Sequence, residues 1–166
     1  MTISPSLQKA IDSLKLQDVY LRDNFSHCHD DFDPKYSDEQ EELDVQQMHV
    51  VRQTVIADLE GNGKLVRVFV RFGVRWVNSI AERSADEHGA PEVVANIEAE
   101  FIAEYTIDQE IKQTCIDEFA TQNASLHVWP YWREFLSSQC ERMRLPRIVL
   151  PAWQLSHHRR GKSTGR

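Results

Sequence analysis

Alternating apolar and charged residues in two long segments constrain the fold of this chain more than any other feature. In residues 65–77 an apolar side chain recurs at every second position, with arginines at three positions between them, and residues 93–107 repeat the pattern with glutamates. Because successive side chains of a β-strand point to opposite faces, both segments are predicted to be strands with one buried face. The residues expected to face the core are Val66, Val68, Val70, Phe72, Val74 and Trp76, and Ile97, Ala99, Phe101, Ala103 and Tyr105.

The second face of the two strands is charged. It carries Arg67, Arg71, Arg75, Glu98, Glu100 and Glu104. If the strands are antiparallel neighbours, arginines lie beside glutamates in pairs that contribute a few tenths of a kcal/mol each. Two more strands are predicted at residues 16–25 and 43–59, and Gly61, Asn62 and Gly63 supply the positive φ values of a hairpin between the second and third strands.

A third periodic segment, residues 128–151, is predicted to contain the main helix. Pro130 is expected in its first turn, where proline removes no hydrogen bond, and nothing breaks the helix before Pro146. An apolar stripe recurs at intervals of three and four residues, and two aromatic residues widen it. These residues are Trp129, Trp132, Leu136, Cys140 and Met143, flanked by Tyr131 and Phe135.

Two interpretations of this stripe remain open. The first is ordinary packing of the helix on the sheet within one chain. The second is contact between copies, because long strands present more apolar area than one helix can cover, so that an oligomer is expected and the stripe is a candidate interface. Two shorter helices are predicted at residues 6–14 and 108–123.

The order of elements is typical of an α+β fold. We expect a four-stranded antiparallel sheet, a meander after a long first crossing loop, with the long C-terminal helix packed on one face. The 166 residues suffice for one domain, residues 1–155, followed by a disordered basic tail at residues 156–166.

Charge, hydropathy and cysteine content argue against nucleic-acid-binding, membrane-spanning and secreted proteins. The net charge is −7, residues 30–44 hold eight acids against Lys35 alone, and no acid follows Glu141. An acidic body argues against nucleic-acid binding by the folded part. No apolar run is long enough for a membrane span, the N-terminus lacks a secretory signal, and three scattered cysteines indicate a reducing compartment. We therefore expect a cytoplasmic protein.

Residues that could carry chemistry are few. His27 to Asp33 read HCHDDFD, but neighbouring residues on an extended chain point to opposite sides and no second ligand cluster completes a site, so no metal is expected. No Ser or Cys nucleophile motif with His and a carboxylate occurs, and no glycine-rich phosphate loop. Cys140 on the apolar side of the helix is expected to be an inert buried thiol. Neither an enzyme nor a cofactor is predicted.

The start and end of the main helix segment resemble a known family. His127 to Glu134 read HVWPYWRE, similar to the start of the helix in SecB export chaperones, where an aromatic residue and Pro-Tyr precede Ala-Arg-Glu. Leu145 to Pro151 read LPRIVLP, like the Phe-Pro and short apolar segment of that family. The similarity covers residues 16–151 and only the helix motif is specific.

The resemblance implies an ATP-independent holdase, a homotetramer built as a dimer of dimers, that binds unfolded preproteins through apolar grooves. Avidity would come from several grooves that each bind weakly. The candidate peptide-binding residues, apolar side chains near loops or on the charged sheet face, are Phe25, Phe32, Tyr36, Leu65, Phe69, Trp153 and Leu155. The alternative is an interaction module dedicated to one partner, such as an antitoxin.

The chain also departs from the export chaperones. Asp23 and Glu98 fall where the family has acids that dock the motor SecA, but His27 stands where a third acid is expected. The second long helix of the family is nearly absent and the tail is basic. These departures argue against SecA as a partner, and the N-terminal helix and basic tail resemble the SecB-like chaperones that accompany toxin–antitoxin pairs.

Overall fold

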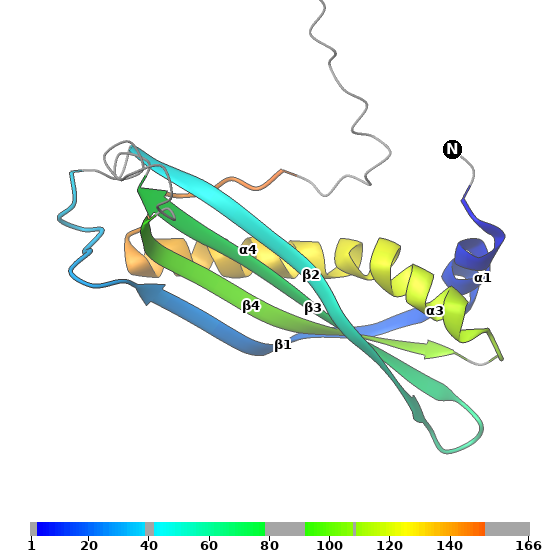
Figure 1. Cartoon of the computed structure of the whole chain (residues 1–166). Coiled ribbons are helices and arrows are strands. Elements are labelled where there is room, and N and C mark those ends of the chain that lie inside the picture. The colour runs from blue at the N-terminus through cyan, green and yellow to red at the C-terminus, as the bar shows by residue number, and fades with distance from the viewer. Residues whose placement is uncertain (1–2, 39–41, 79–91, 108, 152–166) are drawn as a thin grey trace, which may run out of the picture.

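Four long antiparallel strands form the body of the computed structural model, which describes residues 3–38, 42–78, 92–107 and 109–151 (Figure 1). The strands are β1 (Lys15–Cys28), β2 (Leu43–Asp58), β3 (Lys64–Asn78) and β4 (Glu92–Ile107). Their order in the sheet is β1-β4-β3-β2, so β2, β3 and β4 form a meander and β1 lies beside β4. This confirms the predicted α+β architecture and leaves β1 and β2 as the two edge strands.

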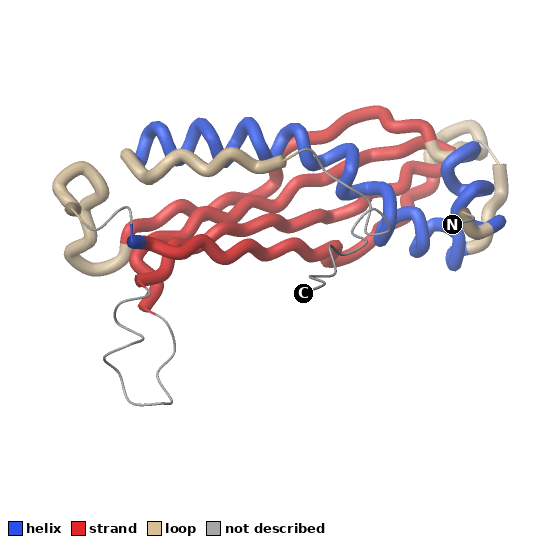
Figure 2. The backbone as a smooth tube through the Cα atoms, turned by 90° about the horizontal axis from the view of Figure 1, so that it is seen from above, coloured by secondary structure: helices blue, strands red, loops and turns tan. Residues whose placement is uncertain are grey.

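The buried face of the sheet is the one that the alternating pattern predicts. All eleven residues expected to face the core in β3 and β4 are at most 3% exposed. In Figure 2 the longest helix, α4 (Ser125–Met143), lies along this face of the sheet. Trp132 stacks on Phe72 of β3, with ring centroids 5.7 Å apart, and Phe135 meets Phe101 of β4 edge to face.

Irregularities in β1 change which side chains share a face. The prediction placed Val19, Leu21 and Phe25 together, but the register shifts between Leu21 and Asp23. A bulge adds one residue and exchanges the two faces for everything that follows. Val19 therefore lies in the core, 5% exposed, whereas Phe25 lies opposite Glu98 on the charged face and is 51% exposed.

The main helix begins earlier than predicted. It forms one continuous helical run with α3 (Gln113–Phe119) and the π-helical turn η2 (Ala120–Ala124), so Pro130 lies inside α4 and not in its first turn. The prediction was wrong because a proline inside a helix costs one hydrogen bond, which packing of Val128 and Trp132 into the core outweighs. The N-terminal helix α1 (Pro5–Ser13) packs on α3, where Ser4 and Ser6 donate hydrogen bonds to the Glu118 carboxylate.

After α4 the chain reverses and runs back along the helix. Arg144 adopts a left-handed conformation with φ 60°, and the Leu145 amide donates to the Cys140 carbonyl over 3.0 Å. Residues 145–151 then lie extended beside α4 (Figures 1 and 2). Leu145 and Leu150 are buried in the core, and the Trp129 indole N–H donates to the Pro151 carbonyl over 2.9 Å. Within the described residues no helix is long and apolar enough to span a membrane.

Candidate functional site

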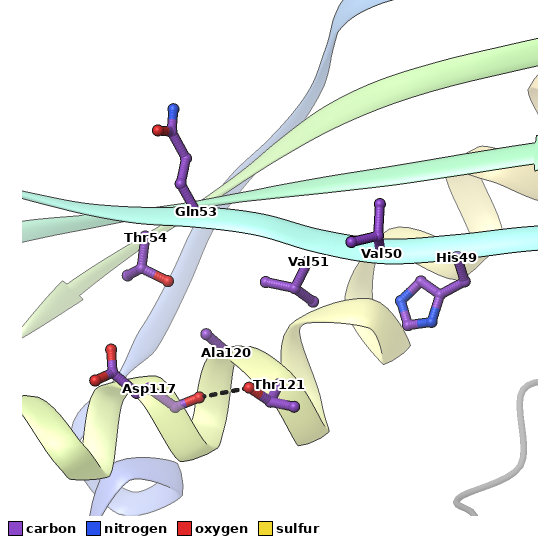
Figure 3. Close-up of a pocket in the computed structure, with 8 residues that line it drawn as sticks. All are labelled: His49, Val50, Val51, Gln53, Thr54, Asp117, Ala120 and Thr121. Carbon is purple, nitrogen blue, oxygen red and sulfur yellow. Dashed lines mark hydrogen bonds between the residues drawn. The ribbon is translucent and has the colours of Figure 1, made fainter.

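A groove of about 440 Å³ lies between the edge strand β2 and the turn that joins α3 to η2 (Figure 3). Val51 and Thr54 point from β2 toward the helix, whereas Gln53 points away. Ala120 and Thr121 form the opposite wall. The complete lining is His49, Val50, Val51, Gln53, Thr54, Asp117, Ala120 and Thr121.

Two backbone irregularities accompany this groove. The pairing of β2 with β3 shifts register between Val51 and Gln53, next to the groove residue Thr54. On the other wall, η2 is a π-helical turn and Thr121 donates its hydroxyl to the Asp117 carbonyl over 2.9 Å. Because a bulge bends a strand and a π turn widens a helix, the two elements separate here instead of closing on each other.

A histidine and a carboxylate mark the two ends of the groove. At one end, His49 Nε2 lies 2.6 Å from Ser125 Oγ, and its ring stacks on Phe72 with centroids 4.9 Å apart. Desolvation lowers the pKa of His49, so the ring is kept neutral near pH 7. At the other end, Asp117 presents an exposed carboxylate that accepts from Gln113 over 2.9 Å. Between them lie the apolar side chains of Val51 and Ala120 and the methyl and hydroxyl groups of Thr54 and Thr121.

The His49 and Ser125 pair has the composition of a nucleophile and base, but its placement does not suit catalysis. Ser125, the first residue of α4, is 1% exposed, so a substrate cannot reach its hydroxyl. Among the described residues, no three His, Cys, Asp or Glu side chains converge as a metal site. The pair therefore does not present a nucleophile to a substrate.

The opposite, uncovered face of the sheet neutralises most of its own charge. Arg67 Nε contacts Glu104 over 3.1 Å, and Glu100, 5% exposed, accepts from Arg52 over 2.9 Å. The predicted rows of arginine and glutamate are thus present. Phe69 lies beneath these ion pairs. The guanidinium carbons of Arg22 and Arg67 are 5.4 Å and 5.5 Å from its ring centroid.

The two acids expected to dock SecA share one cation. Arg71 lies 2.9 Å from Glu98 and 3.7 Å from Asp23. One arginine therefore lies between two carboxylates and balances one of their two negative charges, so the surface around them is of mixed charge. This surface offers a basic partner less attraction than two free acids would.

A second hollow, of about 450 Å³, opens on the charged face around Gly73. A Cβ atom at this glycine would lie 3.0 Å from Met48 Cε and 3.1 Å from Glu98 Cγ, so these two side chains would have to shift by a few tenths of an ångström to admit it. Phe25 stands at its side. Of the predicted peptide-binding residues that the structure describes, only Phe25 borders either of these two cavities.

The other predicted peptide-binding residues are scattered. Tyr36 is 75% exposed on the loop after β1, while Phe32 and Leu65 are partly buried, Phe32 against the core. Phe69 is 4% exposed, beneath Arg22 and Arg67. Trp153 and Leu155 lie outside the described residues.

The stripe predicted as an interface between copies is mainly core. Four of its side chains are at most 8% exposed and pack inside their own chain: Trp129, Trp132, Leu136 and Cys140. Burial raises the pKa of the Cys140 thiol to about 11, in line with an inert cysteine. Tyr131, 47% exposed, lies at the surface, and Phe135 and Met143 are partly buried. The single-chain packing interpretation therefore accounts for most of the stripe.

Sequence reasoning missed the groove. Its β2 wall belongs to a predicted strand, but the pattern of β2 gives no sign that Asp117 and Thr121, more than sixty residues later, lie opposite. The one available signal was an edge strand rich in β-branched residues without strict alternation, which is typical of a strand exposed on both faces.

Comparison with known proteins agrees with this architecture. No protein-family model matches the sequence, and no curated protein is similar to it. Among solved structures, the fold is similar to the SecB-like chaperone Rv1957 of Mycobacterium tuberculosis, solved in complex with a ChAD peptide from the Rv1956 HigA1 antitoxin. The TM-score is 0.66 at 16% identity, over 91% of this chain and 98% of that one. The likeness confirms a SecB-like fold.

Proposed function

We propose that this chain is an ATP-independent chaperone that binds extended, aggregation-prone polypeptide segments in the groove beside β2. The observation that carries the proposal is an apolar groove directly along an edge strand. In the described sheet β2 pairs with β3 alone, so its outer backbone edge faces away from the sheet. The proposal places the protein in the cytoplasm, where unfolded preproteins and antitoxins are made.

An edge strand beside a groove suits an extended client. A segment that adds to β2 gains backbone hydrogen bonds whatever its sequence, and every second side chain points toward the groove. Val45, Val50 and Val55 of β2 are 39–41% exposed and add apolar surface along the same strand. Sequence-tolerant binding of this kind is what a holdase requires.

The proposal includes a homotetramer arranged as a dimer of dimers. Apolar residues remain exposed on the other edge strand, with Leu16 at 43% and Leu21 at 41%, and Tyr131 of α4 is exposed as well. Contacts between copies would cover these side chains. Sedimentation or light scattering tests this point, and a mass of one chain would contradict it.

A second candidate is a module dedicated to one antitoxin. It is favoured by the similar solved structure, which holds a peptide from an antitoxin. The two candidates differ in breadth. A general holdase prevents aggregation of unrelated unfolded proteins, whereas a dedicated module protects one partner. SecA is not among the proposed partners, because Arg71 lies against both candidate docking acids and offsets part of their charge.

The experiment is suppression of aggregation of denatured citrate synthase by stoichiometric amounts of the protein without ATP. Thr54→Arg would fill the groove, because Thr54 points toward the helix. Gln53→Arg is the matched control, since the neighbouring Gln53 points away. We expect the first variant to lose protection and the second to keep it. Equal protection by both variants would contradict the groove as the client-binding site. No protection by the unaltered protein would refute the general holdase function.

A further inference from the structure

We propose that residues 152–155 of this chain themselves occupy the groove when no client is bound, so that the C-terminal segment is a built-in competitor. The inference rests on the proposed function, because it assigns a second occupant to the same groove. Four observations carry it: the direction of the chain up to Pro151, the position of Pro151, the length of chain that follows, and the charge of that chain.

The direction comes from the segment beside α4. After the reversal at Arg144, the chain runs antiparallel to the helix until the Pro151 carbonyl accepts from Trp129 (Figure 1). Continuing the same way leads past Ser125 toward Thr121 and Asp117. The helical wall of the groove thus lies directly ahead of the last described residue.

A series of contacts between aromatic rings shows that Pro151 lies near the groove. Trp129, which holds Pro151, lies with its ring centroid 5.4 Å from that of Phe72. Phe72 in turn stacks on His49, at 4.9 Å, and His49 lines one end of the groove. A chain leaving Pro151 therefore starts next to the His49 end.

The length of the following segment matches the distance to be covered. Trp129 and Thr121 are eight residues apart in a helical run, which corresponds to about 12 Å at about 1.5 Å per residue. Four extended residues span about 13 Å at about 3.3 Å each. Residues 152–155 thus reach Thr121, and they carry Trp153 and Leu155, two apolar side chains at the alternate spacing that an extended occupant presents to one wall.

The charge of the chain beyond this point is complementary. Residues 157–162 contain His157, His158, Arg159, Arg160 and Lys162 and no acid. The far end of the groove presents the exposed carboxylate of Asp117. Trp153 and Leu155 would therefore match the apolar side chains of the groove, and the cations that follow would match the carboxylate of Asp117.

A tethered occupant changes which clients can bind. A short tether gives an effective concentration on the order of millimolar, so even a weakly binding segment occupies the groove much of the time. A client must displace it, and the apparent affinity of the client falls by the fraction of free groove. The competitor would thereby exclude weak, short segments and admit those that bind more than one groove.

The first test measures binding of fluorescently labelled, reduced and carboxymethylated α-lactalbumin, a permanently unfolded protein, by anisotropy. We expect the full-length double variant Trp153→Ala, Leu155→Ala to bind about threefold to tenfold more tightly than the unaltered chain. Ser163→Ala with Thr164→Ala is the control and should bind like the unaltered chain. Equal affinity of all three proteins would overturn the competitor while leaving the proposed function intact. Absence of binding by all three would overturn the proposed function.

The second test locates the segment without any client. In a Cys28→Ser background, Thr121→Cys with Leu155→Cys should form a disulfide within one chain under mild oxidation. Gln46→Cys with Leu155→Cys is the control, because Gln46 bonds to Arg75 on the charged face, away from the groove. We expect the first pair to react at least tenfold faster. Equal rates, or a disulfide between chains only, would overturn the inference even if the first test finds no binding.

Discussion

The substitution Phe69→Ala tests whether this residue belongs to the hydrophobic packing of the charged face or to a peptide site. Phe69 is 4% exposed beneath Arg22 and Arg67. A phenylalanine buries on the order of 200 Å², which at about 25 cal/mol per Å² corresponds to about 5 kcal/mol, and alanine keeps a part of it. We therefore expect the free energy of unfolding to fall by about 3 to 4 kcal/mol, within the usual range for this substitution in a core.

The matched control is Phe25→Ala, the same substitution on the same face. Phe25 is 51% exposed, so only about half of its side-chain area is buried and can be lost, and its removal leaves no closed cavity. A loss of about 1 kcal/mol is expected. The assay is urea unfolding followed by circular dichroism, at one fixed protein concentration because any association of copies adds to the apparent stability.

Two results would refute this reasoning. The first is an equal loss for both variants, which would mean that the arginines do not seal Phe69. The second is a loss under about 1 kcal/mol for Phe69→Ala together with weaker binding of unfolded protein, which would restore Phe69 to a peptide site. Binding should instead be unchanged in those Phe69→Ala molecules that remain folded.

Three further predictions concern charge, pH and thiols. Arg71→Ala leaves Asp23 and Glu98 without their shared cation, so we expect a loss of about 1 kcal/mol or less in low salt that shrinks in 1 M NaCl; a loss independent of salt would exclude an electrostatic cause. Desolvation lowers the pKa of both His49 and His127, so the unfolded chain takes up protons first as the pH falls below about 6.5. The free energy of unfolding should therefore be highest above that pH and should fall as the pH drops through the folded-state pKa values. Measured by urea unfolding at several pH values, this fall should be smaller for His127→Gln than for the unaltered chain. Cys28 is partly exposed while Cys115 and Cys140 are buried, so a disulfide reagent should label one thiol in the native protein and three in urea. Rapid labelling of a second native thiol would contradict the burial of Cys115 in α3 or of Cys140 in α4.

The sequence predicted the sheet well where one rule decided the outcome. In β3 and β4 each residue faces either the core or the charged face, and this alone decides whether it is apolar or charged. Strict alternation therefore located both strands and their pairing. In β1 the same reasoning failed at Phe25, because a bulge between Leu21 and Asp23 depends on how two strands twist together and leaves no mark in the alternation.

The candidate site was less accessible to such reasoning. Pro130 was expected to open the helix because local propensity favours that position, and tertiary packing of Val128 and Trp132 overrode it. Phe69 was named as a candidate peptide-binding residue because it is apolar on the charged face. It is 4% exposed there, because the aliphatic and planar parts of arginine cover its aromatic ring. The groove depends on residues of β2 and η2 that meet only in the folded chain.

The size of the groove determines how a client can be held. A space of about 440 Å³ lined by residues such as Val51 and Ala120 accepts one or two apolar side chains, each contributing about 2 kcal/mol. About 4 kcal/mol corresponds to a dissociation constant near 1 mM, too weak for one groove to retain a polypeptide. Tight binding therefore requires either a long strand added to β2 or several grooves on one oligomer that engage the same client. A variant that remains folded but is reduced to a single copy should lose tight binding of long clients and keep its weak affinity for short peptides.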